Sequence, residues 1–153
     1  PGEANLRMAD VVLINKADST TPEQLDQART SVDSIVGDGV PVILADSVIT
    51  VDEPEQIAGK RVLVVGDGPT LTHGGMSYGA GTIVAQKFGA AEILPGRNSA
   101  AGSIADAFAQ YPHLADEIPA LGYSPQQLAD LEATLNASDA DLVLYSTPSD
   151  LAR

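Results

Sequence analysis

The sequence has no cysteine and no tryptophan, and aromatic residues make up only 4% of its 153 residues. The absence of cysteine excludes disulfides and thiolate metal sites. No apolar run reaches the 18 or so residues that a membrane-spanning helix needs, and residues 1–8 show no apolar signal-peptide region. These absences favour a soluble protein of the cytoplasm with no membrane partner.

Basic residues are also scarce. Lys and Arg total 8 against 21 Asp and Glu, which gives a formal net charge of −13. Nucleic-acid binding depends on Lys and Arg that displace counterions, so a nucleic-acid partner is excluded. The acidic surface fits either a high-salt cytoplasm or an ordinary acidic protein. A phosphorylated ligand would have to be held by backbone N–H groups, a few cations or Mg²⁺.

Predicted strands alternate with predicted helices along the chain. Apolar runs predict strands at residues 11–14, 40–45, 62–65, 92–94 and 142–145. Helical spacing and capping residues predict helices at residues 21–36, 80–88, 101–110 and 124–135. This order predicts an α/β fold, a three-layer α/β/α arrangement around a mostly parallel sheet of about five strands. We expect a single α/β segment over residues 1–153, with a sub-boundary near the polar connection at 52–60.

The first candidate site is Asn15-Lys16-Ala17-Asp18, directly after the first predicted strand. It resembles the NKxD loop of P-loop GTPases, in which the Asp binds the base, the Asn orients the loop and the Lys stem lies along the base. Ligands of open α/β sheets bind at the carboxyl ends of strands, so we predict a nucleotide contact here. The alternative is a solvated turn capped by Asp18. Asp150, in a loop after the last predicted strand, is a rival base contact.

The second candidate site is the stretch from residue 66 to 81, which holds six glycines. It is not a dinucleotide fingerprint, because Leu71 stands where the third glycine is required, and no Gly-Lys-Ser/Thr follows to make a Walker A loop. Glycines and a helix start suit an anion, so the stretch predicts a phosphate cradle with His73 as the candidate catalytic residue. The alternative is a flexible loop with an exposed histidine. The predicted phosphate and substrate ligands are Asp67, Gly68, Thr70, Thr72, His73, Gly74 and Gly75.

Residues 64–74 and 78–81 resemble a signature of archaeal cyclic 2,3-diphosphoglycerate synthetases. Further stretches that are similar to this family are residues 3–10, 111–113, 119–124 and 147–151. Those enzymes usually carry Glu where Gly66 and Gly75 stand here. Any role that an acidic side chain has at these two positions in that family cannot be carried over to Gly66 and Gly75.

The resemblance implies an ATP-dependent ligase that closes 2,3-diphosphoglycerate into a cyclic phosphoanhydride, with Mg²⁺ as a cofactor and GTP not excluded. It implies the C-terminal part of a larger P-loop NTPase-like enzyme, with the P-loop upstream, so we expect the 153 residues alone to be inactive. The expected partner is a small phosphorylated metabolite, and a homodimer of the full-length protein stays open. His73 and His113 lack a third ligand, so we expect no dedicated metal site.

Two other functions remain open on the sequence. A P-loop GTPase of the metallochaperone type would explain the loop at Asn15, but that class uses Cys and His clusters. A non-catalytic remnant that binds a phosphorylated metabolite would explain the missing phosphate-binding loop.

Overall fold

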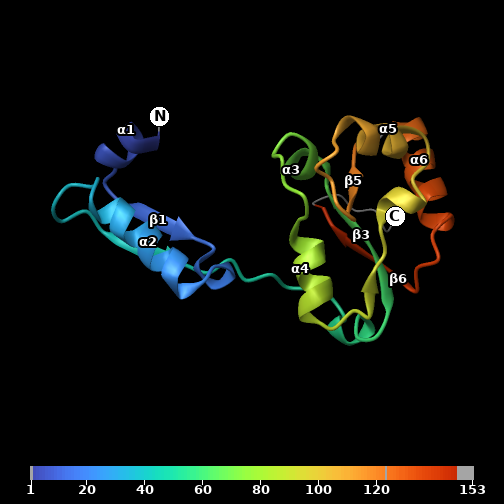
Figure 1. Cartoon of the computed structure of the whole chain (residues 1–153), viewed down its shortest axis with the longest axis horizontal. Coiled ribbons are helices and arrows are strands. Elements are labelled where there is room, and N and C mark those ends of the chain that lie inside the picture. Colours follow the sequence, from blue (N-terminus) through green and yellow to red (C-terminus); the bar gives the residue numbers. More distant parts are fainter. Residues whose placement is uncertain (1, 123, 148–153) are drawn as a thin grey trace. The chain divides into compact units, whose positions relative to one another are not determined.

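The computed structural model describes residues 2–122 and 124–147 and divides into two compact units, Pro1–Ile49 and Thr50–Arg153 (Figure 1). All strand pairs in the described residues are parallel, which confirms the α/β class. The strands form a two-stranded and a four-stranded sheet rather than a single sheet of about five. Asp150 lies outside the described residues.

The N-terminal unit contains one parallel strand pair. Helix α1 (Gly2–Arg7) precedes β1 (Val12–Asn15), and α2 (Pro22–Asp33) leads to β2 (Val42–Ala45), with Val12 opposite Val42. The predicted capping box at the start of α2 is confirmed, because the Thr21 side chain accepts from the Gln24 backbone and the Gln24 side chain accepts from Thr21. Pro22 occupies the first turn, where a missing N–H costs nothing.

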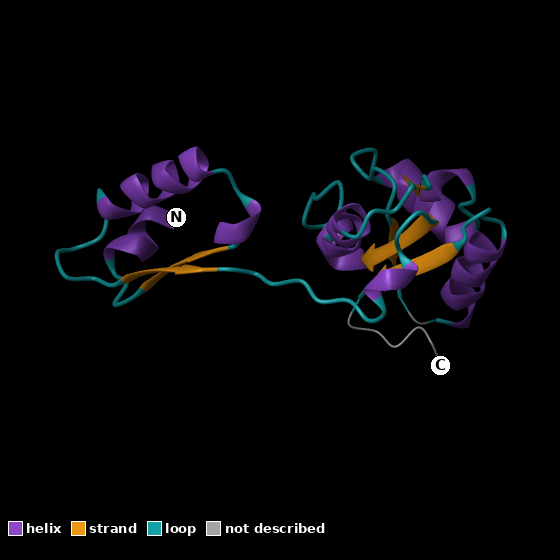
Figure 2. Ribbon diagram, turned by 90° about the horizontal axis from the view of Figure 1, so that it is seen from below, coloured by secondary structure: helices purple, strands orange, loops and turns teal. Residues whose placement is uncertain are grey.

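The C-terminal unit is built around β3 (Arg61–Asp67), whose residues from Val62 to Gly66 are all buried. One edge of β3 pairs with β6 (Leu142–Ser146), and the other pairs first with β4 (Glu92–Ile93) and then with β5 (Ile118–Ala120). Figure 2 shows the helices around this sheet. They are α3 (Gly68–Thr72), α4 (Ala80–Lys87), α5 (Gly102–Gln110) and α6 (Pro125–Asn136). Short 3-10 turns lie at Ala17–Ser19, Pro54–Gln56 and Gly96–Asn98.

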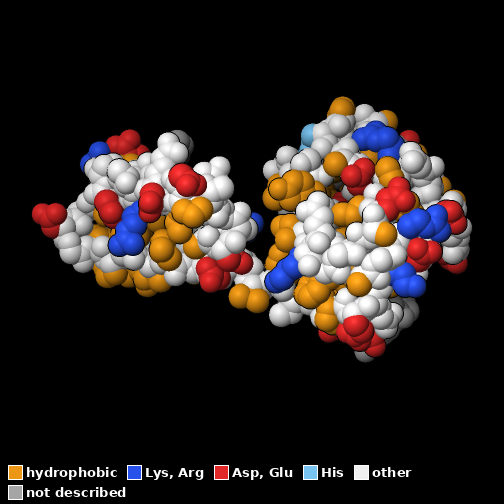
Figure 3. All heavy atoms as spheres, turned by 60° about the horizontal axis from the view of Figure 1, so that its bottom comes forward, with side chains coloured by type: hydrophobic (Ala, Val, Ile, Leu, Met, Phe, Trp, Pro, Cys, Tyr) orange, Lys and Arg blue, Asp and Glu red, His pale blue; other side chains and the backbone are white. Residues whose placement is uncertain are grey.

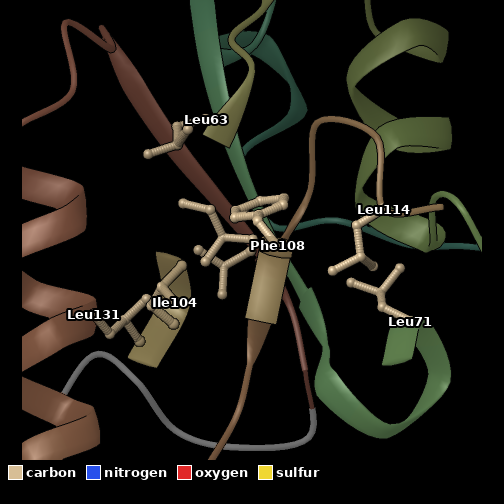
Figure 4. Packing of buried hydrophobic residues seen from close by; sticks show 8 residues of the cluster. Leu63, Leu71, Ile104, Phe108, Leu114 and Leu131 are labelled. Atoms are coloured by element: carbon tan, nitrogen blue, oxygen red, sulfur yellow. The ribbon is translucent and has the colours of Figure 1, made fainter. Parts of the chain in front are cut away.

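The hydrophobic core of this unit lies between β3 and the helices α3, α5 and α6 (Figure 4). Ile104 from α5 meets Leu131 from α6, and Leu71 from α3 meets Leu114. Helix α6 also holds the start of α5, since Asp130 accepts from the Ser103 N–H at 2.9 Å and the Thr134 hydroxyl from the Ala101 N–H at 3.0 Å. The Ser103 N–H lowers the pKa of Asp130 below its ordinary value. The core therefore fixes where α3 and α5 stand relative to the end of β3.

Several elements differ from the sequence predictions, and helix α1 was not predicted. Strand β3 continues two residues beyond the predicted end, and α3 forms inside the stretch expected to be a loop, because Asp67 caps it by accepting from the Thr70 N–H at 3.2 Å. Strand β5 was not predicted, since it has three residues with Pro119 at its centre. No helix among the described residues is long and apolar enough to cross a membrane.

Candidate functional site

A pocket of about 250 Å³ lies at the carboxyl ends of β3 and β5, which pair through Asp67 and Ala120. We call it the strand-end pocket. Open α/β sheets bind ligands at the carboxyl ends of their strands, so this position favours a functional role. Its wall consists of Gly68, Pro69, Thr72, His73, Ser103, Asp106, Ala107, Gln110, Tyr111, Ala120, Leu121 and Gln127.

The pocket brings together three of the predicted phosphate and substrate ligands, namely Gly68, Thr72 and His73. Gly68 is buried where α3 meets β5, and a Cβ there would collide with the Ala120 carbonyl. The glycine is therefore required by close approach of two backbones, which is one of the roles expected of a glycine in this stretch. Gly74 and Gly75 follow α3 as exposed residues and do not line the pocket; Gly75 has φ +66°.

The two threonine hydroxyls already donate within the chain. The Thr72 hydroxyl donates to the Gly68 carbonyl at 2.7 Å, and the Thr70 hydroxyl donates to the Asp67 carboxylate at 2.6 Å. A hydroxyl has one proton to donate, so neither group can also donate to a phosphate without breaking its present bond. The phosphate cradle stays a prediction, and it would depend on backbone N–H groups more than on these hydroxyls.

His73 is exposed, and its hydrogen bond fixes its tautomer. Its Nδ1 lies 3.0 Å from the Thr72 hydroxyl, whose proton is committed to Gly68, so Nδ1 must carry the proton and donate it. In the neutral ring, the Nε2 atom therefore has a lone pair that can accept a hydrogen bond. The Tyr111 ring lies 6.0 Å from both the His73 and His113 rings, and His113 Nε2 donates to the Leu71 carbonyl at 2.8 Å.

Glu117 is a residue that the sequence predictions missed. It is fully buried, and its carboxylate accepts from the Gly79 N–H at 2.8 Å and the Thr82 N–H at 2.7 Å. It thus satisfies free N–H groups at the start of α4 and fixes the second half of the glycine-rich stretch. A Cβ at Gly66 would lie 2.5 Å from Glu117 Oε2, which gives a physical reason for glycine at that position. An acidic residue directly before the apolar Ile118 was the only signal for it in the sequence.

The wall of the strand-end pocket contains no Lys or Arg. Arg97 donates instead to the carbonyls of Phe108 and Leu114, and Arg61 pairs with Asp139 and Asp141. Within the described residues, no group of three or more His, Cys, Asp and Glu side chains is placed to hold a metal ion. The wall of the pocket therefore combines apolar and polar groups and has no Lys or Arg to offer a positive charge.

The predicted nucleotide contacts Asn15, Lys16 and Asp18 lie in the N-terminal unit, at the carboxyl end of β1. Lys16 has φ 60° and ψ 36°, a left-handed conformation that is uncommon for residues other than glycine. The Asp18 carboxylate accepts from the Ser47 N–H at 2.9 Å, so the loop after β1 is joined to the segment after β2. Backbone strain of this kind is often found at functional sites.

No protein-family model matches the chain, and no solved structure matches it. The chain is similar to the arginine synthetase ArcE of Thermococcus kodakarensis, with 53% identity over all 153 residues. It spans about a third (34%) of the length of that relative. The relative is named as a synthetase, which agrees with a ligase at the level of enzyme class, and its name does not mention cyclic 2,3-diphosphoglycerate.

Proposed function

We propose that this chain is a segment of an ATP-dependent synthetase that forms arginine. The observation that carries the proposal is the 53% identity to arginine synthetase ArcE, which extends over the whole chain and so includes both candidate sites. The strand-end pocket suits a small metabolite, because its 250 Å³ lies just below the range of about 300–1,000 Å³ usual for drug-sized ligands.

The nucleotide belongs to the proposal as a second ligand. Asn15, Lys16 and Asp18 are the proposed base contacts, with ATP and Mg²⁺ as cofactors and GTP as the competing nucleotide. When bound, the nucleotide would supply a phosphoryl group that activates the metabolite from which arginine is formed. The 153 residues contain no Gly-Lys-Ser/Thr loop, so we expect the triphosphate to be held by another part of a longer protein.

A chimera tests this function. Our chain would replace the matching third of the ArcE protein of Thermococcus kodakarensis, and arginine formation would be measured under conditions in which the unmodified relative forms it. We expect the chimera to form arginine, because the segment that it carries is 53% identical to the one that it replaces. A chimera that melts cooperatively yet forms no arginine would contradict the proposal and favour a non-catalytic role.

A second function, the closing of 2,3-diphosphoglycerate into its cyclic anhydride, is favoured by the signature at residues 64–74 and 78–81. The same chimera would be incubated with ATP, Mg²⁺ and 2,3-diphosphoglycerate, and the cyclic product followed by phosphorus NMR. Cyclic product without arginine would select this function over the first. The wall of the strand-end pocket is unfavourable to it, because several phosphate charges would face no cation there.

A further inference from the structure

We propose that the strand-end pocket binds a guanidinium group and that Asp106 is its charge partner. The proposal rests on the proposed function for the identity of the ligand, arginine. The chemistry of the pocket wall supports a guanidinium independently.

Asp106 lines the pocket and, within the described part of the chain, makes no hydrogen bond or ion pair. It differs in this from Asp130, which fastens α5 to α6 through Ser103 and also accepts from Gln126. Asp106 is thus an exposed carboxylate at the pocket, with no partner among the described residues. A carboxylate that lines a pocket without a cation nearby favours a positively charged ligand.

Two further residues of the wall, Gln110 and His73, offer acceptors. Gln110 lies one turn after Asp106 on α5 and so shares its face. Its amide nitrogen donates to the Tyr111 hydroxyl at 3.3 Å, which leaves the amide oxygen as an acceptor. His73 adds the lone pair of Nε2, as its tautomer requires.

A guanidinium matches this wall better than an ammonium or a phosphate does. It is planar, carries five N–H donors and has no acceptor, so it can bind a carboxylate and further acceptors at once. The Tyr111 ring adds an aromatic face of the kind that attracts such cations. The net charge of −13 also attracts cations to the protein and repels polyphosphates.

One donor of the wall suits the carboxylate of an amino acid. The Gln127 side-chain oxygen accepts from the Ser124 N–H and hydroxyl, so its amide nitrogen is left to donate. Gln127 belongs to the pocket wall, and its amide N–H can donate to the carboxylate of arginine.

The test is a binding measurement on the 153-residue chain, with L-arginine and methylguanidinium as probes and L-lysine as a cation of equal charge. Amide shifts in NMR spectra should identify the Gln110, Tyr111 and Gln127 region. We expect Asp106→Asn to weaken arginine binding about tenfold, as loss of a charge-assisted hydrogen bond does. Glu132→Gln, the same charge change at an exposed position on α6, should leave binding unchanged.

Equal binding by wild type and Asp106→Asn, shifts in another region, or equal affinity for lysine would each overturn the guanidinium site. The chimera separates this result from the proposed function. If the chimera forms arginine and Asp106→Asn leaves its inhibition by added L-arginine unchanged, the function stands and this pocket is not the site. If the chimera is inactive but the chain binds guanidinium through Asp106, the site stands and the function is wrong.

Discussion

The two units of this chain share parallel strands, yet they differ in what they bury. Of the 15 buried hydrophobic residues in the described part of the chain, 14 belong to the C-terminal unit, and Val12 is the single one in the N-terminal unit. Leu13 and Ile43, which are partners across β1 and β2, are 58% and 50% exposed. Figure 3 shows such apolar atoms at the surface of the N-terminal unit.

The difference follows from how parallel sheets are stabilised. Parallel strands are normally covered on both faces, and a pair of strands alone is marginal in water. In the C-terminal unit, β3 has neighbours on both edges and helices packed against its core. In the C-terminal unit, the strand-end pocket therefore lies on a packed hydrophobic core. In the N-terminal unit, the loop after β1 follows a strand pair that has no such core.

The largest expected effect comes from removing a core side chain. Leu63→Ala, at a fully buried position of β3, should lower the free energy of unfolding of the C-terminal unit by about 2–5 kcal/mol. Leu13→Ala in the N-terminal unit should change it by less than about 0.5 kcal/mol. All four tyrosines lie after residue 50, so tyrosine fluorescence during urea unfolding reports the C-terminal unit alone. Equal midpoints for the two variants would contradict the difference between the units.

A second prediction uses a matched pair of glycines. Gly68→Ala places a Cβ against the Ala120 carbonyl at the strand-end pocket, so we expect a loss of about 1–3 kcal/mol and a displaced α3. Gly37→Ala in the N-terminal unit meets no atom within 4 Å and should be neutral or slightly stabilising. The measurement is thermal melting of both variants, which should show a lower midpoint for Gly68→Ala alone. Unchanged melting of Gly68→Ala would show that the two backbones do not approach so closely.

A third prediction concerns Glu117, which organises the loop before α4. Glu117→Gln keeps one acceptor oxygen and turns a donor toward the second N–H, so either Gly79 or Thr82 loses its bond. An unsatisfied buried group costs about 1–3 kcal/mol. Hydrogen exchange at the first residues of α4 should become faster. The control is Glu92→Gln, an exposed residue of the same unit, and a similar loss in both variants would remove the special role of Glu117.

The sequence predicted the elements with strong local signals and missed those that depend on distant residues. Both capping boxes, at Thr21 and at Ser124, are confirmed, because each depends on residues three apart. The strand β5 is short and interrupted by Pro119, and it forms because β3 offers an edge for it. The same limit applies to the site. Gly68, Thr72 and His73 could be singled out within one stretch, whereas packing brings Asp106 to the pocket wall and Glu117 to the start of α4.

The smallest expected effect is in acid, at the ion pairs that fasten β6 to β3. Arg61 pairs with Asp139 at 2.6 Å and with Asp141 at 3.3 Å, and Asp141 also accepts from the Arg61 N–H at 2.9 Å. The Arg61 N–H and guanidinium hold the pKa of Asp141 below its ordinary value of 3.8, and the guanidinium does the same for Asp139. A lowered pKa in the folded state means that the carboxylate stabilises the fold above the ordinary value. That stability is lost as pH falls through the lower, folded value.

We therefore expect the C-terminal unit to lose stability as pH falls below about 4, where these carboxylates begin to gain protons. Asp141→Asn should be less stable at pH 7, and its stability should fall less steeply in acid, because one of the responsible groups has been removed. Asp26→Asn on the exposed surface of α2 is the matched control and should leave the tyrosine-detected acid transition unchanged. Parallel acid curves for wild type and Asp141→Asn would show that the pairs at Arg61 do not carry the acid sensitivity. Since both aspartates are at the surface, 0.5 M salt should also weaken the effect, and this screening separates an ion pair from a purely geometric role of Asp141.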